Sequence, residues 1–212
     1  VKNYDAMKIG AIILLTISVI FMDLPSRAQR GYINGYVVTL NDDTIAGKIK
    51  DRSSGTFENI YSRIKFKPYK GKKRRFGPDK IKAYAKGEII YESIWVDTYR
   101  QGLQLLPNYR SIAGYGRQQF AKIIYGGYLT YYHLEYADDD LNVDFLPVYK
   151  RKDEPVMVRV TQGIFGLKKK LLSEYFNDCP ELVKKINSGE FKEPYYIAKF
   201  YNQQCFNYGY GP

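Results

Sequence analysis

Two cysteines, Cys179 and Cys205, carry the clearest chemistry in this chain of 212 residues, because no third cysteine competes for them. The first lies at the expected start of a short C-terminal helix and the second near the end of the next helix. A short connection makes consecutive helices antiparallel, which places the start of one beside the end of the other. In an exported chain this relation predicts a disulfide that closes a loop of about 26 residues and adds roughly 3 kcal/mol.

The alternatives for these sulfurs are two reduced, buried thiols or a catalytic thiol. A thiol nucleophile needs a neighbouring base, and the only histidine, His133, falls in an expected strand far away in the sequence. The neighbouring carboxylates of Asp42 and Asp43 fit a turn better than a catalytic pair. We therefore predict no catalytic or cofactor-binding residues and expect a protein that is not an enzyme.

A cluster of carboxylates at 138–144 resembles the opening of a calcium-binding loop. It lacks the glycine at the sixth position, and Tyr149 stands where a bidentate glutamate would be required. A charged turn before a strand explains the cluster better. We predict no metal ligands and no cofactor.

Positive charge is the strongest signal in the composition, with a formal net charge of +11. The densest basic run lies in a segment bounded by Gly and Pro, predicted to be a loop, and consists of Lys70, Lys72, Lys73, Arg74 and Arg75. These residues are the candidate site for an anion or a partner, with Tyr69 and Phe76 able to insert into an anionic surface. A solvated loop without a dedicated partner is the alternative.

The N-terminal residues have the three parts of a secretory signal peptide, namely a lysine, an apolar run over 9–22, and small residues at Ser26 and Ala28. We expect residues 1–28 to be a signal peptide with an N-terminal extension, cleaved between Ala28 and Gln29. The run of about 14 residues reaches roughly 21 Å, which is less than the ~30 Å hydrocarbon core of a bilayer. An uncleaved membrane anchor is therefore the poorer interpretation.

An exported chain reaches the periplasm, or becomes outer-membrane-associated or extracellular. This location argues against nucleic acid as the partner of the basic surface, although basic charge usually suggests it. The anions outside the cytoplasm indicate an envelope protein, a glycan or an anionic membrane surface as partner. The oligomeric state is left open by the sequence.

Residues 29–162 are expected to form a β-rich domain. Turn residues separate β-favouring runs within 35–50, 81–96 and 119–136, which predicts three hairpins. The third hairpin turns at Gly126-Gly127, a pair that tolerates the positive φ angles of a two-residue turn. The sheet is predicted to be antiparallel, and it curls into either a sandwich or a partly open barrel.

The last strand of the third hairpin is rich in tyrosine. We expect one of its faces to pack on the core, and the alternative is an exposed aromatic row that stacks on sugars. That face comprises Tyr128, Thr130, Tyr132, Leu134 and Tyr136.

Residues 163–212 change to helical spacing and are expected to form three short helices packed on the β-rich domain. The first begins near Gly163, and the second is predicted to be capped within Asp178-Cys179-Pro180-Glu181, with an acceptor at the cap and Glu three residues later. The predicted fold class is therefore α+β, an antiparallel sheet followed by a helical bundle.

Several segments carry a family resemblance: GYVVTL and DTIAGKI within 35–49, residues 78–84, YFNDCPEL at 175–182, and the later YNQQC at 201–205. Together they resemble an uncharacterised family of exported proteins that is common in Bacteroidetes. The resemblance implies export from a Gram-negative cell and a β-rich part followed by a helical part. It implies no activity, cofactor or catalytic residue.

These observations favour a secreted or periplasmic envelope protein without enzymatic activity, acting as an interaction or structural module. The alternative is a protein that binds a glycan or an anionic ligand through its tyrosine-rich strands and its basic loop. A buried tyrosine face would remove the stacking platform on which the glycan version depends.

Overall fold

The computed structural model describes residues 31–51, 63–100, 102, 107–137 and 143–206. The predicted signal peptide with Ala28 and Gln29, and the first residues of the calcium-like cluster, lie outside this part of the chain. The chain divides into Val1–Tyr32 and Ile33–Pro212, and the elements below belong to the second unit.

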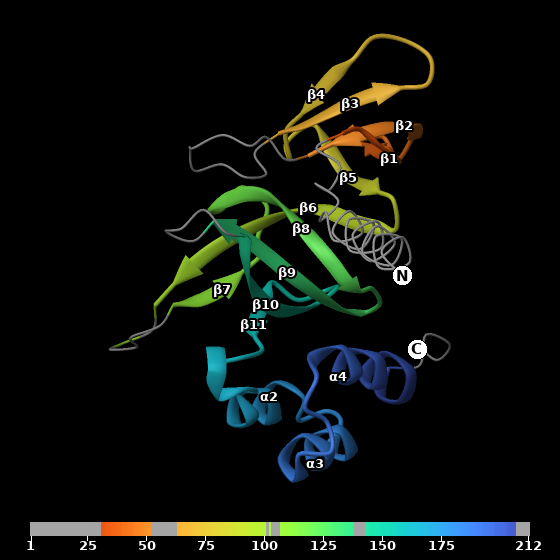
Figure 1. The fold of residues 1–212 in the computed structure, drawn as a ribbon. Coiled ribbons are helices and arrows are strands. Elements are labelled where there is room, and N and C mark those ends of the chain that lie inside the picture. The colour runs from red at the N-terminus through yellow and green to blue at the C-terminus, as the bar shows by residue number, and fades with distance from the viewer. Residues whose placement is uncertain (1–30, 52–62, 101, 103–106, 138–142, 207–212) are drawn as a thin grey trace, which may run out of the picture. The chain divides into compact units, whose positions relative to one another are not determined.

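Antiparallel strands form most of the regular structure (Figure 1). In chain order they are β1 (Ile33–Thr39), β2 (Thr44–Lys50), β3 (Ile64–Pro68), β4 (Arg74–Phe76), β5 (Ile81–Lys86), β6 (Ile89–Tyr99), β7 (Asn108–Arg110), β8 (Arg117–Tyr125), β9 (Leu129–Ala137), β10 (Val143–Arg151) and β11 (Val156–Arg159). Their order in the sheet is β4-β3-β2-β1-β5-β6-β7-β11-β10-β9-β8. Because β6 also pairs with β8, the last six strands of that order close into a barrel.

β6 is the strand at which the outer sheet passes into the barrel. Residues 89–92 of β6 pair with β5, for example Ile89 with Lys86, and residues 97–99 pair with β7. Its other edge pairs with β8 over residues 91–96. The α+β class with an antiparallel sheet is therefore confirmed. The barrel is closed rather than partly open, because β6 is long enough to serve the outer sheet and both barrel neighbours.

Within the described part of the chain, three short α-helices follow the sheet, as predicted. They are α2 (Lys169–Tyr175), α3 (Pro180–Ser188) and α4 (Pro194–Phe200), preceded by a 3-10 turn η1 (Gly163–Phe165) and continued by a π-helical turn η2 (Tyr201–Cys205). The apolar spacing predicts a first helix that starts near Gly163, which is wrong. Gly166 has a φ of 75° and ends the first turn, so α2 begins only at Lys169.

Apolar side chains are buried in three clusters. One lies inside the barrel around Tyr132 and Val148, and a second lies on the inner face of the outer sheet around Val37 and Tyr84. The largest joins the helices to the barrel strands, and its members include Leu129, Tyr149, Leu172, Leu182, Ile186 and Ile197. Full burial of each Leu or Ile contributes about 1.5–3 kcal/mol, so the helical end is fixed mainly by this cluster.

The β8–β9 hairpin is confirmed, but its glycines act differently from the prediction. Neither Gly126 nor Gly127 has a positive φ. A Cβ atom on Gly127 would instead lie 2.5 Å from Oδ1 of Asn202. The Asn202 side chain accepts from the Leu129 N–H at 2.9 Å and donates to the Leu129 carbonyl at 2.8 Å. The absence of a side chain at Gly127 therefore allows Asn202 of η2 to approach the hairpin closely enough to form these hydrogen bonds.

Candidate functional site

Alternation along β2 and β3 places cations on one face of the outer sheet. Ile49, Ile64 and Phe66 are at most 1% exposed and pack into the core of that sheet. The basic residues beside them point to the opposite face, as does Arg75, which lies opposite Lys65 in the register. This surface is termed the cationic face and comprises Lys48, Lys50, Lys65, Lys67 and Arg75.

The strand register sets like charges opposite one another across this face. Lys48 pairs with Lys67, and Lys65 pairs with Lys50 on one side and with Arg75 on the other. Directly opposed residues on one face have Cβ atoms about 4.5–5.5 Å apart, and like charges at this spacing are destabilising. The opposed cations therefore lower the stability of the folded sheet.

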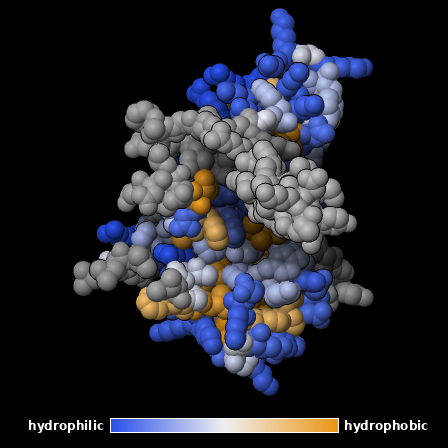
Figure 2. Space-filling model, viewed as in Figure 1, coloured by the Kyte–Doolittle hydropathy of each residue, from blue (hydrophilic) through white to orange (hydrophobic). Residues whose placement is uncertain are grey.

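None of these five side chains forms an ion pair or a hydrogen bond in the part of the chain that the structure describes. The cations of β5 in the same sheet do have acid partners: Lys82 Nζ lies 2.6 Å from an Asp42 oxygen, and Lys86 Nζ lies 2.6 Å from an oxygen of the buried Asp51. The unneutralised charge is therefore a local property of β2, β3 and β4. Figure 2 shows hydrophilic side chains gathered at the end of the unit formed by the β3–β4 hairpin.

Neutralising the central lysine of this face is expected to stabilise the fold. Lys65→Gln should raise the free energy of unfolding by about 0.5 kcal/mol, because Lys65 lies between two other cations. Urea unfolding at low salt measures the gain, and 0.5 M NaCl should reduce it by screening. Lys82→Gln is the control, since it removes a cation that has an acid partner, and should give no gain. A loss of stability in Lys65→Gln would contradict the repulsion.

The tip of the β3–β4 hairpin extends this positive surface. Lys70 and Lys72 are exposed there, and Tyr69 beside them is 62% exposed. The Tyr69 N–H donates to the Ala46 carbonyl at 3.4 Å, which places the tip near the start of β2. Exposed Leu40, in the turn between β1 and β2, lies at the same end of the sheet.

The predicted basic loop is partly a strand. Arg74 and Arg75 lie in β4 rather than in the connection, so the basic run of Lys70–Arg75 folds back along β3. The cause is Phe76, which packs against Phe66 with ring centroids 6.0 Å apart. Phe76 is therefore held in the sheet and is not an exposed anchor, whereas Tyr69 remains available.

The two cysteines form the predicted disulfide between Cys179 and Cys205. It joins the residue before α3 to the last residue of η2. Both sulfurs are bonded, so neither can act as a thiolate nucleophile in this state. The antiparallel relation of the helices, expected from their short connections, brings the two residues together with 5.7 Å between their Cα atoms.

A buried arginine beside the disulfide was not foreseen from the sequence. The Arg151 guanidinium donates to Glu154 at 3.0 Å, to Asp178 at 2.7 Å and to the Tyr175 carbonyl at 2.8 Å. The Tyr201 hydroxyl donates to the other Asp178 oxygen at 2.5 Å. We term these residues the Arg151 cluster; it joins β10 to α2, to the start of α3 and to η2.

The predicted cap of α3 is wrong, because the Asp178 carboxylate binds within the Arg151 cluster. The N-cap residue is Cys179, and no side chain makes a capping hydrogen bond. The Asp178 carboxylate instead accepts hydrogen bonds from Arg151 and Tyr201. Charge-assisted hydrogen bonds are roughly twice as strong as neutral ones, so the arginine outcompetes the helix N–H groups.

The tyrosine-rich face of β9 does not form a continuous exposed row. Tyr132 is 4% exposed inside the barrel and donates to Glu92 at 2.6 Å, and burial followed by this carboxylate raises the pKa of Tyr132. Tyr128 stacks on Phe206 with 3.6 Å between centroids, and only Tyr136 is clearly exposed. The core prediction is therefore correct for the middle of this face, and the sugar-stacking platform does not form there.

The opposite face of β9 is also covered. Leu129 and Tyr131 are buried against the helices, whereas Tyr132 and Leu134 are buried in the barrel. A strand with one solvent-exposed face shows alternation of apolar and polar residues, but a strand buried on both faces does not. The dense aromatic content of β9 reflects this two-sided burial.

The only histidine is held neutral by its surroundings. His133 stacks on Phe145 with centroids 3.8 Å apart, and its Nε2 lies 2.8 Å from the Tyr131 hydroxyl. Burial, and then the positive charge of Lys122, lower the pKa of His133 to about 4. The imidazole ring therefore packs as part of the structure, and no cysteine sulfur is available for it to activate.

Acidification should weaken the fold through this histidine. The folded-state pKa of about 4 lies below the unfolded value of 6.5, so the unfolded chain binds the proton first as the pH falls. Stability is present above pH 6.5, declines between 6.5 and 4, and then levels off. After allowing for partial solvent exposure, the loss is about 1–2 kcal/mol. His133→Gln should remove this part of the decline in urea unfolding curves, and identical pH profiles would contradict the assignment.

The described residues contain no group of three or more His, Cys, Asp or Glu side chains placed to hold a metal ion. Of the calcium-like cluster they include only its end. Asp144 accepts from the Phe145 N–H at 2.7 Å and from the Tyr136 hydroxyl at 2.8 Å. These hydrogen bonds, the backbone one first, lower the pKa of Asp144.

A search of the described helices finds none that combines the length and apolar character required to cross a bilayer. Comparisons of the chain with protein-family models, with curated proteins and with solved structures found no match.

Proposed function

We propose that this chain is an exported, non-enzymatic envelope protein that binds an anionic envelope component through the cationic face and the adjoining hairpin tip. The observation that carries the proposal is the register of β2, β3 and β4, which opposes Lys48 to Lys67 and sets Lys65 between Lys50 and Arg75. No acid within the described residues neutralises them.

An anionic partner would offset the electrostatic repulsion that the opposed cations impose on the free protein. Each opposed like-charge pair costs a few tenths of a kcal/mol to about 1 kcal/mol. Phosphate, carboxylate or sulfate groups placed over the face would convert each repulsion into attraction. Such binding is expected to weaken as salt rises, because exposed charges are screened beyond a Debye length of about 10 Å at 0.1 M.

The disulfide supports export, because disulfides persist in oxidising compartments and are rare in the cytosol. The apolar N-terminal run with its small-residue site supports the same location. A non-enzymatic role is favoured because the described His133 is neutral and hydrogen-bonded to Tyr131, and both cysteine sulfurs are already bonded. A periplasmic or outer-membrane-associated anion is the partner that fits this location.

Binding to two anionic probes and one probe without net charge tests the proposal. The probes are vesicles that contain phosphatidylglycerol, vesicles of phosphatidylcholine alone, and an acidic polysaccharide. We expect binding to at least one anionic probe at low salt, none to phosphatidylcholine, and at least a tenfold loss, about 1.4 kcal/mol, when Lys48, Lys65, Lys67 and Arg75 are all changed to Gln.

The matched control carries the same change in net charge elsewhere. It replaces Lys152, Lys170, Lys184 and Lys192, which are all exposed, by Gln. The proposal requires this variant to bind within about twofold of the wild type. Equal losses in both variants would show that only net charge matters, and a wild type that binds neither anionic probe would refute the function.

A further inference from the structure

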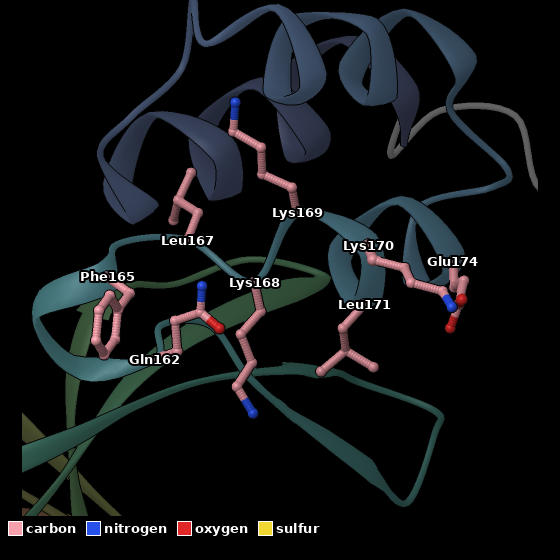
Figure 3. Close-up of a pocket in the computed structure, with 8 residues that line it drawn as sticks. All are labelled: Gln162, Phe165, Leu167, Lys168, Lys169, Lys170, Leu171 and Glu174. Carbon is pink, nitrogen blue, oxygen red and sulfur yellow. The ribbon is translucent and has the colours of Figure 1, made fainter.

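A hollow of about 690 Å³ lies beside η1 and the start of α2 (Figure 3). Three apolar residues, Phe165, Leu167 and Leu171, share its lining with three consecutive lysines and with Gln162 and Glu174. Binding sites for small molecules span about 300–1,000 Å³ and combine apolar walls with a few polar groups. The volume and the lining therefore suit a ligand with an apolar body and a charged end.

The three lysines differ in what they face. Lys169 Nζ donates to the Asn187 carbonyl at 3.2 Å, and Lys170 extends toward Glu174 (Figure 3). Lys168 extends to the same side as Leu171 and away from Lys169 (Figure 3). Its ammonium has no hydrogen bond or ion pair in the described structure. Burial, and then the charge of Arg159, lower the pKa of Lys168, so its charge is held in an unfavourable place.

A second cation without a partner accompanies Lys168. The Nε atom of Arg159 is buried and has no hydrogen-bond partner, and no ion pair of this side chain occurs among the described residues. The Lys168 N–H donates at 2.9 Å to the carbonyl of Val160, the neighbour of Arg159. Burying charge without a counter-charge is costly. Arg159 does not line the hollow, so an anion bound there would neutralise Lys168 directly and reduce the repulsion between Lys168 and Arg159.

Phe165 supplies an apolar surface that the fold leaves uncovered. It is 77% exposed on η1, a turn closed by a hydrogen bond from the Gln162 N–H to the Gly166 carbonyl at 2.9 Å. Gly163 and Gly166 flank the phenylalanine with φ angles of 65° and 75°. These left-handed conformations favour glycine, so the backbone itself holds the ring at the margin of the hollow.

We propose that this hollow binds a single-chain amphiphile whose carboxylate or phosphate head lies at Lys168 and whose chain lies on Phe165, Leu167 and Leu171. The site is separate from the cationic face and is independent of the function proposed for it. It assigns the protein a lipid-like small-molecule ligand.

Calorimetric titration with ten-carbon probes tests this site. Decanoate and decyl phosphate carry the two candidate heads, and 1-decanol carries the same chain without charge. At least one anionic probe should bind with a Kd of about 10–100 μM, and the tighter of the two identifies the head group. Decanol should bind at least about tenfold more weakly than that probe.

Two variants test where the ligand binds, and a third variant is the control. Lys168→Gln should weaken the preferred probe at least tenfold, and Phe165→Ser about threefold to fivefold. Neither should lower the melting temperature, because the Phe165 ring is exposed and the Lys168 ammonium has no partner to lose. Lys170→Gln removes a charge from the same lining and should bind within about twofold of the wild type.

Three results would overturn the proposal. These are no binding of either anionic probe below its micelle concentration, equal binding of decanol, and a Lys168→Gln variant that binds like the wild type while Lys170→Gln does not. Because the cationic face is untouched by these variants, its own vesicle and polysaccharide assays remain a separate test.

Discussion

Replacing Arg151 by methionine is expected to lower the free energy of unfolding by about 3 kcal/mol. The change removes three hydrogen bonds made by the guanidinium and leaves two carboxylates, Glu154 and Asp178, without their cation. The guanidinium also lies 4.5 Å from the ring centroid of Tyr175 and 5.1 Å from that of Tyr201. Removing one partner of a fully buried pair costs about 3–5 kcal/mol, and the partial exposure of both carboxylates places this case at the low end.

Thermal unfolding followed by circular dichroism measures the effect. A loss of about 3 kcal/mol in a unit of this size corresponds to a melting temperature lower by roughly 6–12 °C. Arg110→Met is the matched control, because Arg110 also pairs with an acid, Asp97 at 2.7 Å, but is more exposed than Arg151. Its expected cost is below about 1 kcal/mol. Equal costs for the two variants would show that burial does not distinguish Arg151.

The elements that sequence predicted well are those built from neighbouring residues. The β1–β2, β5–β6 and β8–β9 hairpins each join two β-rich runs across a few turn residues. The disulfide was also predictable, since helix spacing and short connections place Cys179 beside Cys205. In these cases the partners belong to consecutive elements of the chain that are joined by short turns or connections.

The closure of the barrel and the Arg151 cluster depend instead on pairs whose partners are separated by other strands or by irregular connections. The β6–β8 pairing requires Ile94 to meet Gln119, and Arg151 reaches Asp178 only after the chain has completed β11 and α2. Local periodicity carries no information on such register. An arginine near the end of a strand looks like any solvated cation until the helices cover it.

The candidate binding surface was partly predictable. The basic run containing Lys70 and Lys72 is evident in the sequence, and basic residues alternate with Ile64 and Phe66 along β3. The sequence does not reveal that β2 lies beside β3 in a register that opposes like charges. Because of that register, basic residues that are spread along the sequence lie together on one cationic face, and this face is the basis of the proposed function.

Loss of the disulfide is expected to cost about 3 kcal/mol, as the chain-entropy model gives for a closed loop of this length. The effect should be greatest at the C-terminal end, because Cys205 ends η2, whose Asn202 holds the β8–β9 hairpin and whose Tyr201 binds Asp178. Hydrogen exchange on oxidised and reduced protein should therefore show the largest loss of protection there. The double variant Cys179→Ser/Cys205→Ser is the control, since a reductant should not affect it.

The disulfide and the Arg151 cluster should also be coupled, because both fix the segment at Asp178 and Cys179. Once the disulfide is absent, η2 is less restrained and Tyr201 leaves Asp178 more readily, so Arg151→Met should cost less than in the oxidised protein. Neighbouring residues commonly couple by 0.5–3 kcal/mol, and we expect about 1 kcal/mol here. Strictly additive losses in the double-mutant cycle would mean that the two restraints act on separate parts of the helical end.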